Sequence, residues 1–575
     1  MSIQAQDVHN KVNYQFHEED PKDFRWGHLT TDEIHLSTIL QKTLEYATEF
    51  LSSINDRPVG VSPVLPHISI GHEGEGGDGD EGTEGALLSH SSSPYAPLSV
   101  QGVGAEAALT HFKHVYSTSI SGSTGPRYLG FVTGGSTPAA IAGDWLVSTF
   151  DQNAANSGDS SANHIEKEVI HWLKELFNLS NAHSGVFVSG ATMANFVGLA
   201  IARQWVAQKV GVDVAKDGLY SMPKIKVLSG MAHSSTYKAL AMLGMGRGSL
   251  ESVQCLGFRE AVDVEKLRGK LQECKEKGEV CIVVGNAGTV NSGDFDDLVG
   301  ISKLKKEFEF WLHVDAAFGG FAACSPKFSK LVDGLDNADS ITVDAHKWLN
   351  VPYDSAMQFT RHRQLQVEVF QNQGAYLGAV SMTNPDFVHL TPENSRRFRA
   401  LPAWFSLMAY GKDGYKNLME QSCKLAFQLG EILTKSPHFT VLTPPILNIV
   451  TFTIGRGDRD AEEVFRFLNL LNQKGDTFMT ATRVGPHAAI RAAFSNWRTM
   501  DKDVEVVWHS LVEAYVKGGF RRKNEEQEDR VVNEEDDEKV TQEMKLMEGS
   551  EEEMRQQEIE KGMRETELQE GKHKS

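Results

Sequence analysis

The chain has 575 residues and a mass of 63.5 kDa, more than one hydrophobic core usually fills, so we expect two or three folded regions. Acidic residues outnumber basic ones, 77 to 57, and the formal net charge is −20. This balance argues against general binding to nucleic acid or to anionic membranes. The apolar fraction of 40% is ordinary for a globular protein and excludes a chain that is disordered throughout.

The five cysteines form no recognisable framework. Their number is odd, they include no CxxC pair, and none is spaced with histidine as in a metal site. We therefore expect neither disulfides nor a metal, and a reducing compartment. The sequence begins without an apolar leader and contains no run of about 18 apolar residues, which predicts a cytoplasmic protein with no membrane span.

The acidic excess is concentrated in two stretches. Residues 71–85 (GHEGEGGDGDEGTEG) contain six acids, seven glycines and no apolar residue. Residues 521–575 contain 19 acidic and 11 basic residues, a net charge of −8. Neither stretch can bury enough apolar surface to offset the entropy of ordering it, so we expect both to be mobile.

Taken in chain order, the elements begin with an apolar pattern of helical period at 31–53. Helical patterns follow at 165–176 and 192–209. They interleave with short apolar runs at 185–188, 225–228, 280–284 and 311–314. Alternating strands and helices are typical of βαβ units and predict an α/β region with a mostly parallel sheet, whose chemistry lies at the carboxyl ends of the strands.

Beyond residue 411 the pattern changes, with strand candidates at 448–453 and 488–494 among longer helical patterns. We predict four regions. They are an N-terminal helical segment with the acidic loop (1–93), a large α/β domain (94–411), a smaller C-terminal α+β domain (412–520) and an acidic tail (521–575).

Two stretches place reactive residues just past predicted strands. Lys347 lies in SITVDAHKWLN (340–350), where a lysine can form a Schiff base if its pKa is lowered. Asp315 lies in WLHVDAAFGG (311–320), where a carboxylate can hold a protonated pyridine nitrogen. Taken singly, each has an ordinary alternative, a surface lysine beside a packing tryptophan and a capping carboxylate.

Two further stretches begin predicted helices. His233 precedes Ser-Ser-Thr in GMAHSSTYKAL (230–240), either as a helix cap or as an imidazole lying over a flat cofactor. The small-residue turn in VSGATMAN (188–195) opens the next helix, and the backbone amides at such a start can bind phosphate.

In this order and wording, the four stretches resemble the group II pyridoxal-phosphate-dependent amino-acid decarboxylases, a family that includes aromatic-amino-acid and glutamate decarboxylases. The resemblance covers residues 126–497 and includes GPRYLGFVTGG, NSRRFRALPAWFSLMAYG and IRAAFSNWRT. It implies the PLP-dependent transferase fold of type I, with a large α/β domain and a smaller C-terminal α+β domain. It also implies pyridoxal 5'-phosphate (PLP) as cofactor, a small amino acid as substrate and a homodimer with interfacial active sites.

The resemblance also implies roles for individual residues. Lys347 would carry the cofactor as an internal aldimine, Asp315 would pair with the ring nitrogen, His233 would stack on the ring, and Ala317 would lie under the other face. Residues Ala191, Thr192, His346 and Asp344 would surround the phosphate. The family's Gly-Thr-Thr is here Gly-Thr-Val, which assigns Thr289 to the cofactor with its second threonine lost.

The resemblance leaves the product open. Counting back from the RRFR run places Phe387 where relatives carry a tyrosine that helps to protonate Cα. Relatives with phenylalanine there can let oxygen intercept the reaction and release an aldehyde. Alternatively, Tyr376, His233 or a water supplies the proton and the product is an amine, which we favour.

The substrate is also open. The aromatic wall of the relatives corresponds here to Phe131, Val132 and Thr133, which is less aromatic and roomier. Arg127 would pair with an acidic side chain such as that of glutamate, or it is a structural arginine. We favour an aromatic substrate slightly. One competing function is another fold-type-I lyase or aminotransferase. The other is a cofactor-free scaffold, and the intact Lys347, Asp315 and His233 argue against the scaffold.

Overall fold

The computed structural model describes residues 28–60, 98, 102–158, 160–372, 380–456 and 459–520. The acidic loop at 71–85, the tail at 521–575 and Tyr376 lie outside these residues, so the predictions made for them stay predictions. The chain divides into two compact units, Met1–Ser510 and Leu511–Ser575. Of the second unit, the described part is the last turns of a helix and the residues up to Phe520. Apart from the end of this helix, α14 (Asp501–Lys517), everything described below belongs to the first.

A seven-stranded mixed sheet forms the centre of the first unit. Its strands are β1 (Ser184–Val188), β2 (Lys226–Ser229), β3 (Leu250–Ser252), β4 (Cys281–Asn286), β5 (Phe310–Asp315), β6 (Ser340–Asp344) and β7 (Ala356–Thr360). Their order is β1-β7-β6-β5-β4-β2-β3. Only β7 runs antiparallel to its neighbours, and all other adjacent pairs are parallel. The mostly parallel sheet predicted from the sequence is confirmed.

The sheet is buried on both faces, which explains the nearly continuous apolar runs of its strands. In β4, Cys281 and Val283 point into one core cluster, whereas Ile282 and Val284 point into the other. This alternation is the two-residue period of a strand. Because water reaches neither face, every position of these strands favours an apolar residue.

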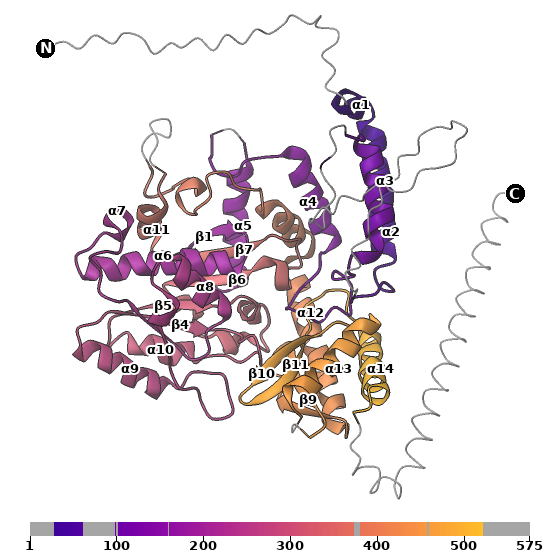
Figure 1. Ribbon diagram of the computed structural model, residues 1–575. Coiled ribbons are helices and arrows are strands. Elements are labelled where there is room, and N and C mark those ends of the chain that lie inside the picture. Colours follow the sequence, from indigo (N-terminus) through magenta and orange to yellow (C-terminus); the bar gives the residue numbers. More distant parts are fainter. Residues whose placement is uncertain are drawn as a thin grey trace, which may run out of the picture. The chain divides into compact units, whose positions relative to one another are not determined.

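Helices supply the covering layers (Figure 1). The elements around the sheet are α4 (Pro138–Phe150), α5 (Ala162–Leu176), α6 (Ala191–Lys209), α7 (Val214–Asp217), α8 (Ser234–Met242), α9 (Val264–Glu276), α10 (Leu298–Leu304) and α11 (Arg363–Phe370). Side chains of α6, α8 and α11 join one core cluster, and those of α4, α5, α9 and α10 join the other. Polar caps start several of these helices. Asp263, for example, accepts hydrogen bonds from two amides at the start of α9.

Three N-terminal helices, α1 (His28–Ile34), α2 (Leu36–Ser52) and α3 (Ala105–Tyr116), contain no buried residue. The helix predicted over 31–53 is therefore present, with a break at His35. Lys113 of α3 pairs with Glu49 of α2 at 2.6 Å. The described part of the chain leaves much of the apolar surface of α2 uncovered, since Leu36, Leu40 and Leu44 are 44–58% exposed.

A second, four-stranded antiparallel sheet follows. It consists of β8 (Phe439–Thr443), β9 (Ile449–Ile454), β10 (Thr480–Val484) and β11 (His487–Ala493), in the order β10-β11-β9-β8. The long α12 (Ala400–Lys435), α13 (Ala461–Lys474) and α14 (Asp501–Lys517) accompany it in sequence. The predicted boundary at residue 411 falls inside α12, at Gly411, where φ is 58° and ψ is −170°. The domain limits themselves stay predictions.

Candidate active site

The carboxyl ends of three neighbouring parallel strands meet at one edge of the large sheet. Strand β4 ends at Asn286, β5 at Asp315 and β6 at Asp344. A cavity of about 330 Å³ opens there and also includes the first residues of α6. All nine residues expected to bind the cofactor line it: Ala191, Thr192, His233, Thr289, Asp315, Ala317, Asp344, His346 and Lys347. Their individual roles stay predictions.

Lys347 lies in the turn Ala345–Leu349 that follows β6. Its Nζ is 3.0 Å from Asp344 Oδ2 and 5.6 Å from the centre of the Phe318 ring. Asn350 fixes the turn, because its Nδ2 donates to the carbonyl oxygens of Trp348 at 3.0 Å and Ser495 at 2.9 Å. Trp348 is fully buried. The sequence therefore buries the tryptophan and leaves the adjacent amine facing the cavity.

The start of α6 meets Asp344. The backbone N–H of Ala191 donates to Asp344 Oδ1 at 2.6 Å, so this carboxylate connects the positive end of the helix with the lysine amine. His346 lies beside it, and burial lowers the pKa of its imidazole. Its Nδ1 is buried, and the imidazole lies against the backbone of Ser355 and the ring of Tyr353, whose centre is 4.4 Å from its own. This corner therefore presents helix amides, an amine and an imidazole to an anionic group.

Asp315 and His233 lie deeper in the cavity. Asp315 is 7% exposed; its carboxylate accepts hydrogen bonds from Asn195 Nδ2 at 2.9 Å and from the backbone N–H of Ala317 at 3.2 Å. His233 caps α8, since its Nδ1 accepts from the N–H and the hydroxyl of Ser235. Burial lowers the pKa of His233. His233 is thus a helix cap that also lines the cavity, and its stacking on a cofactor ring stays a prediction.

The hydroxyl of Thr289 is hydrogen-bonded to other residues of the protein. It donates to Glu260 Oε2 at 2.6 Å and accepts from the backbone N–H of Asp294 at 3.0 Å. Its only proton is therefore engaged. Thr289 lines the cavity without a hydroxyl proton to give to a bound group.

None of the residues expected to contact the substrate lines the cavity in the described part of the chain. Val132 and Thr133 are buried, and the Thr133 hydroxyl is 3.0 Å from that of Tyr353. Phe131 is 61% exposed. The segment 131–134 nevertheless passes close to the backbone of Lys347. A Cβ added to Gly134 would lie 1.7 Å from the Lys347 carbonyl oxygen, so only glycine fits there.

Arg127 is engaged with the segment before the last two strands. Its Nε donates to the carbonyl oxygen of Asp476 at 2.9 Å, and its Nη1 lies 4.0 Å from Asp503 Oδ1. These contacts match the structural alternative given for Arg127. They leave the guanidinium poorly placed for a substrate carboxylate.

The placement of Phe387 contradicts its predicted contact with the substrate. The side chain is 2% exposed, belongs to the core cluster of α6 and α8, and lies 4.8 Å beneath the Arg396 guanidinium. A ring with no exposed face cannot touch a substrate in this subunit or in a second copy. Counting residues across a loop of unknown length produced this error.

Two functional candidates were missed by the sequence reasoning. Asn195 lies beneath the cavity and contacts Asp315. Arg491 of β11 is 6% exposed, donates to the Val290 carbonyl oxygen at 2.8 Å, and helps to lower the pKa of His233. Its Nε is buried without a partner among the described residues. Arg491 lies in the quoted IRAAFSNWRT stretch, but nothing in that pattern indicated that its guanidinium is buried near His233.

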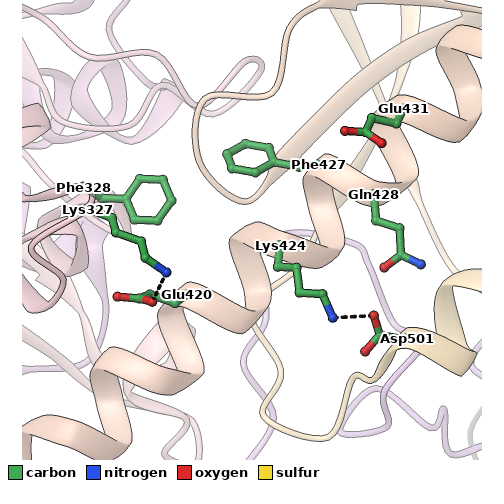
Figure 2. Close-up of a pocket in the computed structure, with 8 residues that line it drawn as sticks. All are labelled: Lys327, Phe328, Glu420, Lys424, Phe427, Gln428, Glu431 and Asp501. Atoms are coloured by element: carbon green, nitrogen blue, oxygen red, sulfur yellow. Dashed lines mark hydrogen bonds and ion pairs between the residues drawn. The ribbon is translucent and has the colours of Figure 1, made fainter.

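A second hollow of about 550 Å³ lies along α12 (Figure 2). Four of its five charged side chains are paired with one another, and the fifth is Glu431. Lys327 contacts Glu420, and Lys424 contacts Asp501, each at 2.6 Å. Because these groups neutralise each other in pairs at the surface, the hollow offers no reactive group comparable to those around Lys347.

The described residues contain no helix long and apolar enough to cross a membrane. They also contain no group of three His, Cys, Asp or Glu side chains able to hold a metal ion. The five cysteines are free thiols.

Comparison with known proteins identifies the family. Residues 101–455 match the model of the pyridoxal-dependent decarboxylase conserved domain. The chain belongs to this family. An aromatic-L-amino-acid decarboxylase from Bacillus atrophaeus is 30% identical over 391 residues, which cover 66% of this chain and 79% of that protein. A 4-hydroxyphenylacetaldehyde synthase from Rhodiola rosea is 24% identical and covers 84% of this chain and 95% of that protein.

A solved structure shows the same fold. The crystal structure of Oryza sativa TDC with PLP and tryptamine has a TM-score of 0.72 and 20% identity, and covers 84% of this chain and 98% of that one. The expected family and the fold of type I are thereby confirmed. The decarboxylase is a PLP-dependent enzyme that acts on an amino acid.

The cavity of this decarboxylase fits PLP. The cofactor has a phosphate, an aldehyde and an aromatic ring nitrogen, and the cavity offers helix amides, the Lys347 amine and the Asp315 carboxylate to these three groups. The start of α6, the Lys347 amine and the His346 imidazole line the end of the cavity where the phosphate would lie. The residues present therefore match the family's cofactor without rearrangement of the fold.

Proposed function

We propose that the chain decarboxylates an L-amino acid to the corresponding amine and CO₂, and that an aromatic substrate is preferred slightly over a glutamate-like one. One observation supports this most strongly. Residues from β1–α6, β2–α8, β5 and β6, separated by up to about 160 positions in the sequence, line a single cavity at the carboxyl edge of the sheet. A scaffold without catalytic activity has no need of this convergence.

The proposed roles follow from the contacts. Lys347 holds the cofactor covalently, and the first amides of α6 bind its phosphate. Asp315 faces the ring nitrogen and keeps it positively charged. When bound, PLP supplies an electron sink for the electron pair that remains when CO₂ leaves. Asp315 therefore acts by electrostatic preorganisation and transfers no proton itself.

The proton that replaces CO₂ has two candidate donors. His233 lines the cavity, and its lowered pKa makes the imidazole neutral near pH 7. A neutral imidazole can donate from one nitrogen while the other accepts. Tyr376, the second candidate, lies outside the described residues. Phe387 is excluded because it is buried in the core.

The preference for an aromatic substrate rests on two contacts. Arg127, the residue predicted to bind an acidic side chain, is engaged by Asp476. Phe318 forms part of the cavity wall beside Lys347.

An aldehyde product is the second candidate, because two of the relatives are aldehyde synthases. The argument from Phe387 no longer supports it, since that ring does not reach the cavity. We therefore propose the amine as the main product.

We further propose a homodimer with active sites at the interface. The described part of the chain leaves Leu36, Leu40 and Leu44 of α2 exposed along one helix, and a patch of this kind marks a contact surface. Sedimentation of the purified chain, alone and with Leu40→Glu, tests this. A dimer that becomes a monomer in the variant supports the proposal, and a monomeric wild type refutes it. The free thiols are consistent with the predicted cytoplasmic location.

A substrate screen with identification of products tests the function. Purified chain supplemented with PLP is incubated with each amino acid, and amine, CO₂, peroxide, aldehyde and keto acid are measured. Amine and CO₂ in equal amounts from an aromatic amino acid support the proposal, whereas peroxide with aldehyde supports the oxidative alternative. Keto acid indicates an aminotransferase. Lys347→Ala is the control that removes covalent cofactor binding.

A further inference from the structure

A buried amide lies beneath the candidate active site. Asn195 occupies the second turn of α6 and is fully buried. Its side chain makes four hydrogen bonds, to Asp315, Ser235, His313 and Thr342. An amide has two donor protons and two acceptor lone pairs, so its bonding capacity is completely used.

The Asp315 carboxylate fixes which way this amide points. A carboxylate only accepts, so Nδ2 must be the atom 2.9 Å from Asp315 Oδ2. The oxygen Oδ1 then faces Thr342 Oγ1 at 2.7 Å and His313 Nε2 at 2.9 Å, both of which must donate.

His313 is suited to this donation. It is fully buried, and burial lowers its pKa to about 4, so the ring is neutral near pH 7. With its proton on Nε2, its Nδ1 accepts from Ser340 Oγ at 2.7 Å. Ser340 Oγ in turn accepts from Trp311 Nε1 at 2.9 Å. One consistent set of protons therefore runs from Trp311 to Asn195.

The hydrogen-bond network around Asn195 has two branches: one amide proton leads to Asp315, and the second leads through Ser235 to His233. Asn195 Nδ2 donates to Ser235 Oγ at 3.0 Å, so Ser235 is free to give its own proton to His233 Nδ1 at 2.7 Å. The Ser235 N–H donates to the same nitrogen at 3.2 Å. His233 Nδ1 is therefore an acceptor, and the proton of the neutral ring lies on Nε2.

We infer that Asn195 is a positioning residue for two catalytic groups at once: it aims the Asp315 carboxylate at the cofactor's ring nitrogen, and by donating to Ser235 Oγ it directs the Ser235 hydroxyl proton to His233 Nδ1, which reinforces the hold of the Ser235 N–H on the tautomer with its proton on Nε2. The inference rests on the proposed function, because both groups act on the bound cofactor and substrate. It goes further by assigning the coupling of the two groups to one amide that touches neither cofactor nor substrate.

Variants separate the two branches. Asn195→Ala removes the bond to Asp315 and the bond to Ser235, whereas Ser235→Ala removes the hydroxyl that links Asn195 to His233 and leaves the bond from Asn195 to Asp315 in place. Thr342→Val is the matched control, since it removes one bond to the same amide, keeps the side-chain shape and breaks neither branch. Groups that orient active-site residues typically contribute about 10- to 100-fold.

Three readouts distinguish positioning from a merely structural role. We expect Asn195→Ala to weaken PLP binding and to alter the visible absorbance of the lysine-bound cofactor, both through Asp315. We also expect it to lower kcat about 10- to 100-fold, with a much smaller change in KM. Ser235→Ala should shift the pH profile of kcat and leave the absorbance unchanged. Thr342→Val should lower only the unfolding midpoint. If Asn195→Ala matches Thr342→Val in absorbance, PLP affinity and pH profile, the inference is overturned.

A further measurement separates this inference from the proposed function. The ¹⁵N spectrum of histidine-labelled chain without added PLP, assigned with His233→Gln, reports the tautomer directly. We expect an unprotonated Nδ1 at His233 in the wild type and a larger share of the Nδ1-protonated ring in Ser235→Ala and Asn195→Ala, a share limited by the Ser235 N–H, which still donates to Nδ1 in both variants. A protonated Nδ1 in the wild type overturns the inference even if the enzyme is active. If the tautomer is the expected one but no decarboxylation is detected, the proposed function is overturned instead.

Discussion

Phe387→Tyr tests whether this position controls the product. The hypothesis from residue counting expects the new hydroxyl to reach the substrate and raise the yield of amine. The structure predicts a loss of stability instead, because Phe387 is 2% exposed and packed among the side chains of α6 and α8. The two hypotheses therefore predict different results for the same substitution, a higher yield of amine or a lower stability.

The magnitude follows from the packing. A hydroxyl buried without a partner costs about 1–3 kcal/mol, and forcing an extra atom into a close-packed core costs about 1–3 kcal/mol. The neighbouring Arg396 guanidinium, 4.8 Å from the ring, is already bonded to Glu166, Ala154 and Phe187. Its Nε is buried without a partner among the described residues, so a new hydroxyl that accepted from this nitrogen would bring the cost to the lower end of the range. Phe387→Ala, which leaves a cavity, should cost about 3–5 kcal/mol.

Urea denaturation of the PLP-loaded enzyme measures the stability change, and amine and peroxide are measured on the same preparations. Phe131→Tyr is the control, because its ring is 61% exposed and the change should stay within about 0.5 kcal/mol. A Phe387→Tyr enzyme with the wild-type midpoint and a changed ratio of amine to peroxide would show that the ring reaches the substrate after all.

Four further outcomes follow from the described contacts. Lys347→Ala should abolish both the visible absorbance of bound PLP and turnover. Glu166→Gln should cost about 3–5 kcal/mol in thermal or urea unfolding, because Glu166 and Arg396 are a fully buried ion pair. Acidification from pH 6.5 to about 4 should lower the unfolding free energy by about 3 kcal/mol through His313, because His313 binds a proton at a higher pH in the unfolded chain than in the folded one. His313→Gln should weaken this pH dependence. Deleting residues 521–575 should leave kcat unchanged in a steady-state assay, and loss of turnover in a folded truncation would contradict this.

The large sheet was predictable because burial on both faces leaves a strong local signal. Strands β4 and β5 are runs of apolar residues that end in Asn286 and Asp315, and both were located to within one or two residues. Lys347, Asp315, His233 and the turn at 188–195 were found for a related reason, and the family resemblance implied the remaining cavity residues. Each lies at or just after a strand end or at a helix start, and parallel strands bring these positions to one edge.

The substrate side was less predictable because loops determine it. Phe387 was assigned by counting from Arg396, but a loop absorbs insertions that counting cannot detect. Arg127 carried a charge that suited an acidic substrate, yet its partner, Asp476, lies almost 350 positions away in the sequence. Contacts between positions so distant leave no local periodicity to read.

Asn195 shows the same limit at the centre of the site. In the sequence it is one polar residue in an apolar helix, and its bonds reach α8, β5 and β6. A polar group that is fully buried must be satisfied, so its presence in the core implies partners, although the sequence does not say which. Because those partners include Asp315 and, through Ser235, His233, the stability of the core and the chemistry of the cavity depend on the same amide. A substitution there should therefore affect folding and proton placement together, whereas Ser235→Ala separates them.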